Sequence, residues 1–401
     1  MYQSIDAVMK AYVENGDMAG GALLVRKGGE ILYEEYFGYA DLKEKNKITD
    51  RSIFRMMSMT KCITAVAVMI CAERGLVELD APLSKYIREF AHLKVAADPR
   101  YEFKENSLKK IPFMLLNFRI DKVRTKTAER EITIRDLLSH SSGIQQGMVG
   151  LLDMLKDKKE YSSLREYCLH LAKNPLDFQP GEGTGYSPLA GFDILGYVVS
   201  VVSQMSLEDF VQKEICKPLS MTDTTFFLKE EQKKRLVRLY KRKGKHLIDV
   251  TDTKADEEGF YHAKELSYEH GSGGLYSTLH DYDRFGQMLL NNGILEGHRV
   301  LQEESVRMLH SEGPYKHMEP EPGFVWGLGV KIRQKPELSE CKATRGTYGW
   351  SGAVGTHFFI SPKENLEVCF MTNRSDLNGS GSYISAKVEE LVFERWGDKI
   401  S

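Results

Sequence analysis

The sequence predicts an α+β protein in which one antiparallel sheet, flanked by helices, is built from both ends of the chain. Two observations lead to this prediction. Strand-like runs stand near the N-terminus and again near the C-terminus, and the long stretch between them is mostly helical in pattern. Separated strands of this kind complete one sheet when the middle of the chain forms an insertion. We therefore expect a sheet domain from residues 1–50 and 266–401, and an inserted, mainly helical domain from residues 51–265.

The N-terminal elements follow from the spacing of apolar residues. Apolar side chains recur at helical spacing between positions 5 and 13, which predicts an amphipathic helix. Residues 21–27 and 30–36 are rich in strand formers, and the Gly28-Gly29 pair between them is typical of a two-residue hairpin turn. Residues 60–74 place apolar side chains on one helical face and are followed by Gly75, a common stop signal, so a helix is expected there.

The middle of the chain contains two further helices and two unusual segments. Residues 192–202 are apolar nearly all round, which predicts a buried helix, and Ser206-Leu-Glu-Asp209 has the pattern of a helix start. Residues 95–130 mix charged and apolar runs, and both a lid and a partner surface are open for them. Residues 229–246 are strongly basic. We favour a solvated hairpin turning at Gly244 over a phosphate-binding patch, because most charge runs are exposed faces.

The C-terminal third returns to strands. Thr278-Leu-His-Asp281 has the pattern of a helix start, and Asn292-Gly293 is expected to end that helix. Residues 356–360 and 366–372 are apolar, strand-like runs. Residues 383–396 close the chain with apolar side chains at helical spacing.

Composition excludes several classes of protein. The 401 residues carry 55 Lys and Arg against 57 Asp and Glu, a balance that argues against a nucleic-acid or membrane-surface binder. No apolar run reaches the roughly 18 residues of a membrane span, and the N-terminus lacks the continuous apolar core of a signal peptide, so we expect a cytoplasmic protein. The six cysteines are scattered without metal-ligand spacing, and we expect buried thiols and no metal.

The pattern that can carry chemistry is a serine one helical turn before a lysine. Gly-x-Ser-x-Gly, His-Glu-x-x-His and phosphate-loop patterns are absent. In Ser-x-x-Lys the amine lies close enough to take the serine proton. The pattern occurs at Ser58-Met-Thr-Lys61, Ser107-Leu-Lys-Lys110 and Ser339-Glu-Cys-Lys342. Ser58 is favoured because it precedes an apolar helix, whose free N–H groups stabilise an anion, although a plain helix cap is the alternative.

Two further motifs follow Ser58 in order. Tyr186-Ser187-Pro188 stands between a Gly-rich turn and the expected buried helix, and Trp350-Ser351-Gly352 stands just before a C-terminal strand. Together the three motifs resemble those of the serine β-lactamase and penicillin-binding-protein superfamily, most closely its class C β-lactamase and family VIII carboxylesterase branch. Residues 134–143, 217–224, 271–278 and 326–329 resemble secondary signatures of that family, so the resemblance covers roughly residues 15–395.

The resemblance implies a β-lactamase/transpeptidase-like fold with the active site at the junction of the two domains. Ser58 is then the acylated nucleophile, and Lys61 is its proton acceptor or electrostatic partner. Tyr186 serves as general base and then as general acid. The backbone N–H groups of Ser58 and Ala353 form the oxyanion hole. Such a site needs no cofactor.

Two positions depart from the β-lactamase pattern. Pro188 stands where the second motif usually ends in Asn, and it offers no side-chain or backbone donor. Trp350 stands where the third motif usually begins with Lys or His, and an indole cannot supply the charge that binds a substrate carboxylate. Both changes favour an esterase or acyltransferase acting on a neutral acyl group over a β-lactamase or D-amino-acid peptidase. A catalytically silent binding protein is the third hypothesis, which the joint retention of Ser58, Lys61 and Tyr186 argues against.

Several residues around these motifs are candidates to contact the substrate. We expect a small-molecule ester, lactam or acyl substrate, and neither a nucleic acid nor a membrane as partner. The expected contact residues are Pro188, Tyr276, Trp326, Trp350, Ser351 and Gly352. His140 and His357 are interpreted as structural because the family mechanism needs no histidine, and Cys62 as an inert core thiol.

Overall fold

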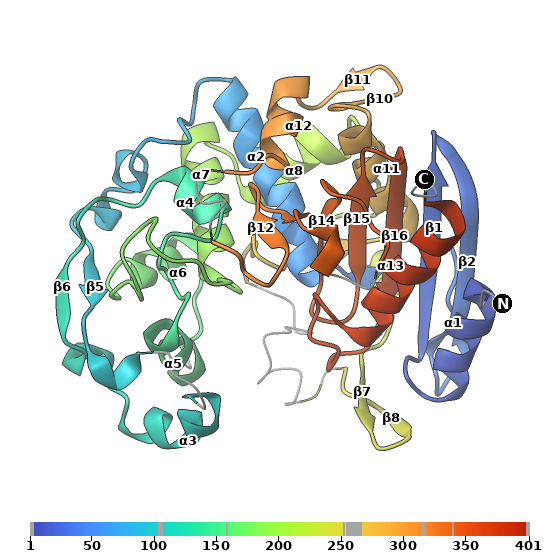
Figure 1. Cartoon of the computed structure of the whole chain (residues 1–401), viewed down its shortest axis with the longest axis horizontal. Helices are drawn as coiled ribbons and strands as arrows, with labels where there is room; N and C mark the ends of the chain where they lie inside the picture. Colours follow the sequence, from blue (N-terminus) through green and yellow to red (C-terminus); the bar gives the residue numbers. More distant parts are fainter. Residues whose placement is uncertain are drawn as a thin grey trace.

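The computed structural model describes residues 4–102, 107–157, 159–251, 253, 267–313, 318–338 and 341–397. Its architecture is the predicted α+β class, with a large antiparallel sheet on one side and a mainly helical part on the other (Figure 1). Both chain termini lie on the sheet side. The boundaries at residues 50 and 266 stay a prediction.

The two ends of the chain meet in the centre of an eight-stranded sheet of order β12-β13-β14-β15-β16-β1-β2-β3. The predicted N-terminal hairpin is formed by β1 (Gly20–Lys27) and β2 (Glu30–Asp41), and both turn glycines have positive φ. The predicted C-terminal strands are β15 (His357–Ser361) and β16 (Leu366–Thr372). Strand β16 pairs antiparallel with β1, so two strands that are more than 300 residues apart in sequence are neighbours in the sheet.

The remaining strands of the sheet are short. They are β3 (Asn46–Lys47), β12 (Phe324–Trp326), β13 (Lys331–Arg333) and β14 (Tyr348–Ser351). Strand β14 includes Trp350 and Ser351, so the third motif is itself the end of a strand, where the sequence places it only before one.

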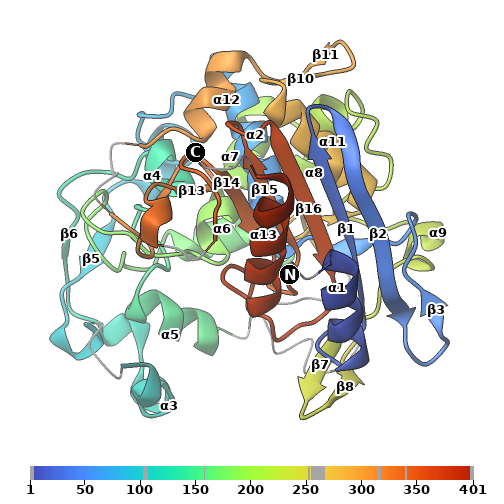
Figure 2. The same cartoon turned by 45° about the vertical axis from the view of Figure 1, so that its right-hand side comes forward.

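Helices cover both faces of the sheet because its strands alternate apolar side chains between two cores. Helices α1 (Ile5–Glu14) and α13 (Tyr383–Trp396) pack with Leu23 and Val25 of β1 on one face. Helices α2 (Thr60–Glu73) and α11 (Leu279–Leu290) pack with Ala22 and Leu24 on the other. Figure 2, turned by 45°, shows α1 and α13 together in front of the strands. All four helices were expected from the sequence.

The helical part is built around α7, the expected apolar helix, which is largely buried. Its α-helices are α3 (Ser107–Asn117), α4 (Ile134–Leu138), α5 (Met148–Lys156), α6 (Leu164–Leu171), α7 (Ala190–Ser203), α8 (Leu207–Val211) and α9 (Glu230–Lys233). Helix α12 (Glu303–Leu309) packs on α2. Small strand pairs are β4 (Phe54–Arg55) with β9 (Tyr276–Ser277), β5 (Lys94–Ala96) with β6 (Thr125–Thr127), and β10 (Ile294–Leu295) with β11 (His298–Arg299).

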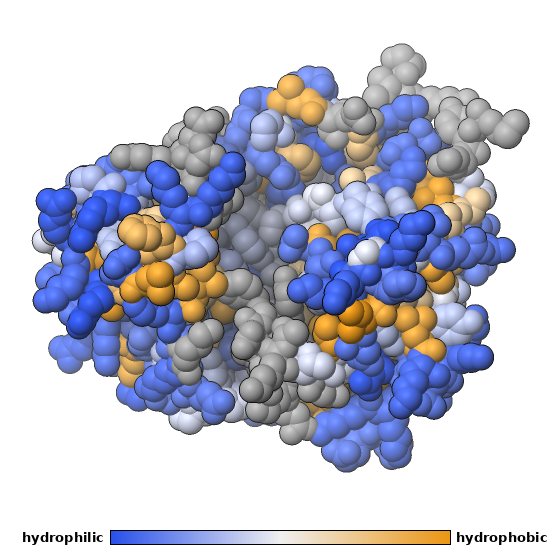
Figure 3. All heavy atoms as spheres, turned by 90° about the horizontal axis from the view of Figure 1, so that it is seen from below, coloured by the Kyte–Doolittle hydropathy of each residue, from blue (hydrophilic) through white to orange (hydrophobic). Residues whose placement is uncertain are grey.

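The two unusual segments of the sequence form different structures, a hairpin in one and an exposed helix in the other. The basic stretch contains the predicted hairpin, β7 (Tyr240–Lys243) and β8 (His246–Asp249), and Gly244 has positive φ in its turn. The stretch 95–130 includes α3, where Phe113 is 72% and Leu116 is 81% exposed. The face seen from below is mostly hydrophilic, with apolar side chains gathered in separate patches (Figure 3). A lid or partner role for 95–130 stays a prediction.

No single helix within the described ranges is long and apolar enough to cross a membrane. Among the described helices, α7 taken together with residues 207–216 is the one pair that passes the same test of length and composition, and this pair is bent by 78°.

Candidate active site

Ser58 lies where the chain passes from a short strand into a buried helix. Strand β4 pairs with β9, residues Met57–Met59 form a 3₁₀ turn, and α2 begins at Thr60. Met57, directly before Ser58, has a φ of 48°, a left-handed conformation that is uncommon for a bulky residue. Strain of this kind concentrates at functional sites, and here it presents the Ser58 side chain at the N-terminal end of α2.

Lys61 is fully buried one turn after Ser58. Its Nζ lies 3.2 Å from Ser58 Oγ and donates to the carbonyl oxygens of Pro188 at 2.7 Å and Ser272 at 2.8 Å. These contacts hold the amine against the serine hydroxyl. A buried cation is tolerated when its donors are satisfied, and the three acceptors match the three N–H groups of an ammonium.

Tyr186 approaches Ser58 from the other part of the molecule. Its hydroxyl makes a 2.6 Å hydrogen bond with Ser58 Oγ, and the Trp350 indole Nε1 donates to the same hydroxyl at 3.3 Å. The Lys61 ammonium lies 5.1 Å from the centre of the Tyr186 ring. The fold therefore brings together all three motifs, which are separated by 128 and 164 residues in sequence.

Aromatic side chains pack around Tyr186. The Trp326 ring lies 4.8 Å from the Trp350 ring and 4.4 Å from the His140 ring, and Tyr186 is 5.0 Å from His140. His140 Nδ1 accepts from the backbone N–H of Ser187. Burial, and secondarily the charge of Lys61, lower the pKa of His140 well below its usual value, so this ring is neutral. A neutral ring held by the second motif agrees with the structural role predicted for His140.

The turn after β14 packs against the segment that carries Ser58. A Cβ on Gly352 would lie 2.4 Å from the Met56 carbonyl oxygen, so only glycine permits this approach. Among the described residues, the backbone N–H groups of Ser58 and Ala353 have no hydrogen-bond partner. An oxyanion hole requires two such free N–H groups, and the role expected for these two stays a prediction.

Three predicted contact residues are placed in other ways. Pro188 contributes its carbonyl oxygen to Lys61. Tyr276 lies in β9, where it pairs with Arg55 of β4. Ser351 points to the opposite face of β14 from Trp350, because its hydroxyl is 2.7 Å from His357 Nδ1.

Two residues that help to position Lys61 are not predicted from the sequence. Ser272 binds Lys61 through a backbone carbonyl, and Asp193 of α7 fixes that loop by accepting from the Ser272 N–H at 2.8 Å. A backbone acceptor leaves no side-chain signal. The glycines at 271, 273 and 274 mark the loop in the sequence without revealing which atom it supplies.

The other sequence candidates lie apart from this site or outside the described residues. Ser107 begins α3, and Ser339 lies outside the described residues. Five of the six cysteines, Cys62 included, are buried, as expected, and Cys341 is half-buried. Burial raises the pKa of Cys62 to about 12, which keeps it a thiol. Within the part of the chain that the structure describes, no cluster of His, Cys, Asp and Glu is arranged to hold a metal ion.

The site and fold define a member of a known class. Residues 5–392 match the family described as Beta-lactamase, and the chain belongs to this family.

Its relatives include a protein named as an esterase. The chain is 27% identical over 380 residues to Protein Rv1367c of Mycobacterium tuberculosis (91% of this chain and 88% of that protein). It is 25% identical over 418 residues to Esterase EstB of Burkholderia gladioli (98% and 95%).

Solved structures support the same fold. "EstCE1, a hydrolase with promiscuous acyltransferase activity" superposes with a TM-score of 0.76 at 23% identity, covering 97% of both chains. Simvastatin synthase LovD of Aspergillus terreus gives 0.76 at 20% identity, covering 98% of both. The predicted superfamily and fold class are therefore confirmed, and the family and its relatives point to a hydrolase.

Proposed function

We propose that this protein is a serine hydrolase that forms an acyl-enzyme at Ser58 and acts as a carboxylesterase or acyltransferase on a neutral acyl substrate. The observation that carries the proposal is the contact of Ser58 Oγ with both Tyr186, at 2.6 Å, and Lys61, at 3.2 Å. A nucleophile in reach of a base and a buried amine is the arrangement that activates a serine hydroxyl. The esterase and acyltransferase activities named for EstB and EstCE1 agree with it.

Acylation begins when Ser58 Oγ attacks the ester carbonyl carbon and its proton passes to the Tyr186 oxygen, which acts in this step as the phenolate and becomes the phenol. We assign the base to Tyr186 because its oxygen is nearer to Oγ than the Lys61 nitrogen is. The new oxyanion accepts from the N–H groups of Ser58 and Ala353. When the tetrahedral intermediate collapses, the ester C–O bond breaks, and Tyr186 gives its proton to the leaving alcohol.

Deacylation reverses these roles. A water molecule or an acceptor alcohol attacks the acyl carbon while Tyr186 takes its proton. Ser58 then leaves and recovers the proton from Tyr186. Water yields a carboxylic acid, and an alcohol yields a new ester, so one site performs hydrolysis and transfer alike. Lys61 holds Ser58 and the second-motif loop in fixed positions relative to each other, through its hydrogen bonds to Ser58 Oγ and the Pro188 carbonyl oxygen.

The preference for a neutral acyl group rests on what surrounds the nucleophile. Trp350 uses its indole N–H on Tyr186 and packs against Trp326, which makes this side of the site aromatic. Pro188 has no N–H, and its carbonyl is occupied by Lys61. Neither residue offers a cation or amide donor to a substrate carboxylate or acyl-amide.

The test compares turnover of 4-nitrophenyl butyrate and of a chromogenic cephalosporin by the purified protein. We expect ester cleavage that falls at least 1,000-fold in Ser58→Ala, together with little cephalosporin turnover. Ser107→Ala is the matched control, because Ser107 has the same Ser-x-x-Lys spacing but begins α3 instead of α2. It should leave ester cleavage within twofold of the wild type.

Other outcomes favour the alternatives. Dominant cephalosporin turnover that depends on Ser58 would favour a β-lactamase or D-amino-acid peptidase. Intact mass after a serine-directed phosphonate separates an enzyme from a silent binding protein. We expect one adduct, absent in Ser58→Ala, and no labelling at all would overturn the acyl-enzyme.

A further inference from the structure

A cavity lies on the opposite face of the sheet from Ser58. It encloses about 530 Å³ between strands β13–β15 and helix α13, a size within the range of small-ligand pockets. Its lining includes Ser351, His357 and Phe359, which point to this face, and Glu389 of α13. Trp350 also lines it, and therefore lies between this cavity and Tyr186.

A continuous chain of polar contacts runs along one wall of this cavity. Ser351 Oγ lies 2.7 Å from His357 Nδ1, His357 Nε2 lies 2.9 Å from Glu389 Oε1, and Arg333 Nη2 donates to Glu389 Oε2 at 2.7 Å. Burial opposes a charge on Glu389. The hydrogen bond from His357 and the nearby positive charges nevertheless lower its pKa to about 2, so it is an anion.

Arg333 has more donors than this chain uses. Its side chain is only 5% exposed, and one face of the guanidinium lies over the Phe324 ring. Among the residues that the structure describes, its Nε and Nη1 atoms have no hydrogen-bond partner. Leaving a buried donor unsatisfied costs the free energy of removing it from water without a compensating hydrogen bond. Two such donors on a side chain that lines a cavity indicate that the site is built to receive an acceptor.

The carboxylates that line the cavity do not accept hydrogen bonds from Arg333 Nε or Nη1, and each of them is already paired with a cation. Glu389 is bound by Arg333, Glu321 pairs with Lys331, and Glu390 accepts from Lys387. The wall also has apolar side chains, which include Phe324, Leu338, Phe359 and Ala386, alongside the hydroxyl groups of Thr347, Ser380 and Ser385. The cavity thus combines the free donors of Arg333 with a group of apolar side chains.

We propose that this cavity is a second ligand site, which binds a monocarboxylate with an aliphatic chain. The carboxylate accepts from Arg333, and the chain lies along the apolar wall. Arginine suits this role because its planar, permanently charged group matches a carboxylate. The proposal does not depend on the reaction at Ser58.

The experiment is calorimetric titration of the Ser58→Ala protein with octanoate and with its neutral analogue, octanamide. We expect octanoate to bind at least tenfold more tightly than octanamide. In the same background, Arg333→Gln should weaken octanoate binding at least tenfold. Equal affinity for the two ligands, or no binding of octanoate, would overturn the proposal.

A second variant locates the site even if Arg333→Gln folds poorly. Ala386 is an exposed residue of α13 on the cavity wall, so Ala386→Phe narrows the cavity without disturbing the core. It should also weaken octanoate binding at least tenfold. The matched control is Val201→Phe, at a 38% exposed position of α7, which should change the affinity less than twofold. Unchanged binding in Ala386→Phe would place octanoate elsewhere and reject this cavity.

Discussion

Trp350 connects the third motif to the proposed base through one hydrogen bond. Its indole N–H donates to Tyr186 at 3.3 Å, and we propose that Tyr186 carries a proton to and from Ser58. Because Trp350→Phe keeps an aromatic ring but removes the donor, we expect kcat for ester cleavage to fall about five- to tenfold. That corresponds to about 1 kcal/mol for one hydrogen bond.

Trp326 provides the matched comparison for this prediction. It packs in the same aromatic cluster, but within the described part of the chain its buried Nε1 has no hydrogen-bond partner. Trp326→Phe therefore changes ring size without removing a hydrogen bond, and its kcat should fall less than that of Trp350→Phe. Steady-state kinetics of both variants measure kcat for ester cleavage. An equal or larger loss of kcat in Trp326→Phe would show that aromatic packing, and not the indole donor, supports the reaction.

The side chains of the site were easier to predict than its backbone partners. Ser58, Lys61 and Tyr186 stand in motifs of fixed spacing, and the structure brings Ser58 within hydrogen-bond reach of both Lys61 and Tyr186. The Ser272 carbonyl depends on how the loop after residue 270 folds over α2, and residue identity does not encode that path. The direction of the Ser351 side chain follows from strand alternation in β14, and no strand is predicted from the sequence at that position.

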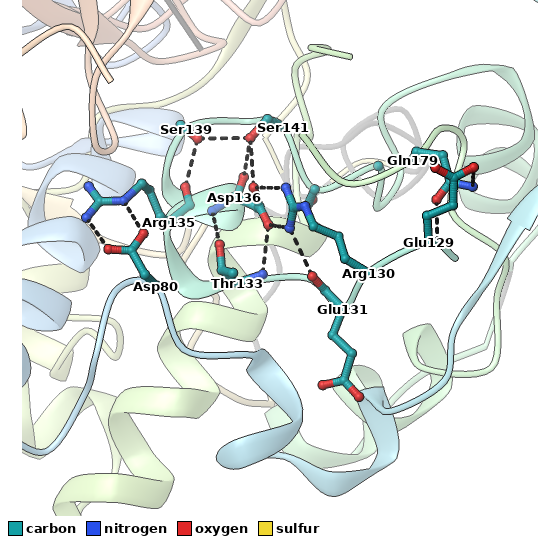
Figure 4. A network of polar contacts seen from close by, with 12 residues as sticks. Asp80, Glu129, Arg130, Glu131, Thr133, Arg135, Asp136, Ser139, Ser141 and Gln179 are labelled. Atoms are coloured by element: carbon teal, nitrogen blue, oxygen red, sulfur yellow. Dashed lines mark hydrogen bonds and ion pairs between the residues drawn. The ribbon is translucent and has the colours of Figure 1, made fainter. Parts of the chain in front are cut away.

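At the scale of single elements, α4 shows how the helical part supports the site. Thr133 and Asp136 form a capping box at its start, and Arg130 donates to both carboxylate oxygens of Asp136, at 2.6 and 2.9 Å (Figure 4). The turn that leaves α4 carries His140, which packs on Tyr186. The ionic contact at one end of this short helix therefore fixes the position of the loop at the other.

Asp136→Asn should destabilise the protein by about 2–3 kcal/mol. Breaking a fully buried ion pair costs about 3–5 kcal/mol, and we expect less here because Arg130 is 40% exposed although Asp136 is fully buried. The control is Asp80→Asn in the same view (Figure 4). Asp80 is 75% exposed and pairs with Arg135, so its loss should cost no more than about 1 kcal/mol. Urea unfolding measures both, and equal costs would contradict this account.

Element length explains which parts of the fold were predictable. The long elements β1, β16, α2, α11 and α13 carry enough residues for a period of 2 or 3.6 to show, and each was found. Strands β12, β13 and β14 have three or four residues, too few for alternation to stand out. They are strands because they add to the edge of an existing sheet, which is a tertiary effect.

At the scale of the whole molecule, one buried cluster joins three distant segments. Arg26 of β1 donates to both oxygens of Asp283 of α11, each at 2.9 Å. Glu367 of β16 stands opposite Arg26 in the strand register and is fully buried. A Cβ on Gly286 of α11 would lie 2.1 Å from a Glu367 oxygen, so glycine there leaves room for the carboxyl group. The cluster ties both chain ends to α11.

Glu367 should make the whole fold less stable as the pH rises. Burial, and then the charge of Asp283, raise the pKa of Glu367 well above its usual value of 4.5, so the folded protein keeps this proton when the unfolded chain has lost it. Stability from this group is complete below pH 4.5 and is lost as the pH rises toward the folded pKa, with a slope of at most about 1.4 kcal/mol per pH unit.

Glu367→Gln, which cannot ionise, should remove this slope and raise the free energy of unfolding at pH 8 relative to the wild type. Urea unfolding of both proteins between pH 5 and 8 measures the difference, and Glu30→Gln, at an exposed position of β2, is the control that should keep the wild-type slope. Because other buried acids contribute slopes of their own, the prediction concerns the difference between wild type and variant. A difference that does not change with pH would mean that Glu367 ionises as readily in the folded sheet as in the unfolded chain, and that Arg26 and Asp283 hold the chain ends together without its proton.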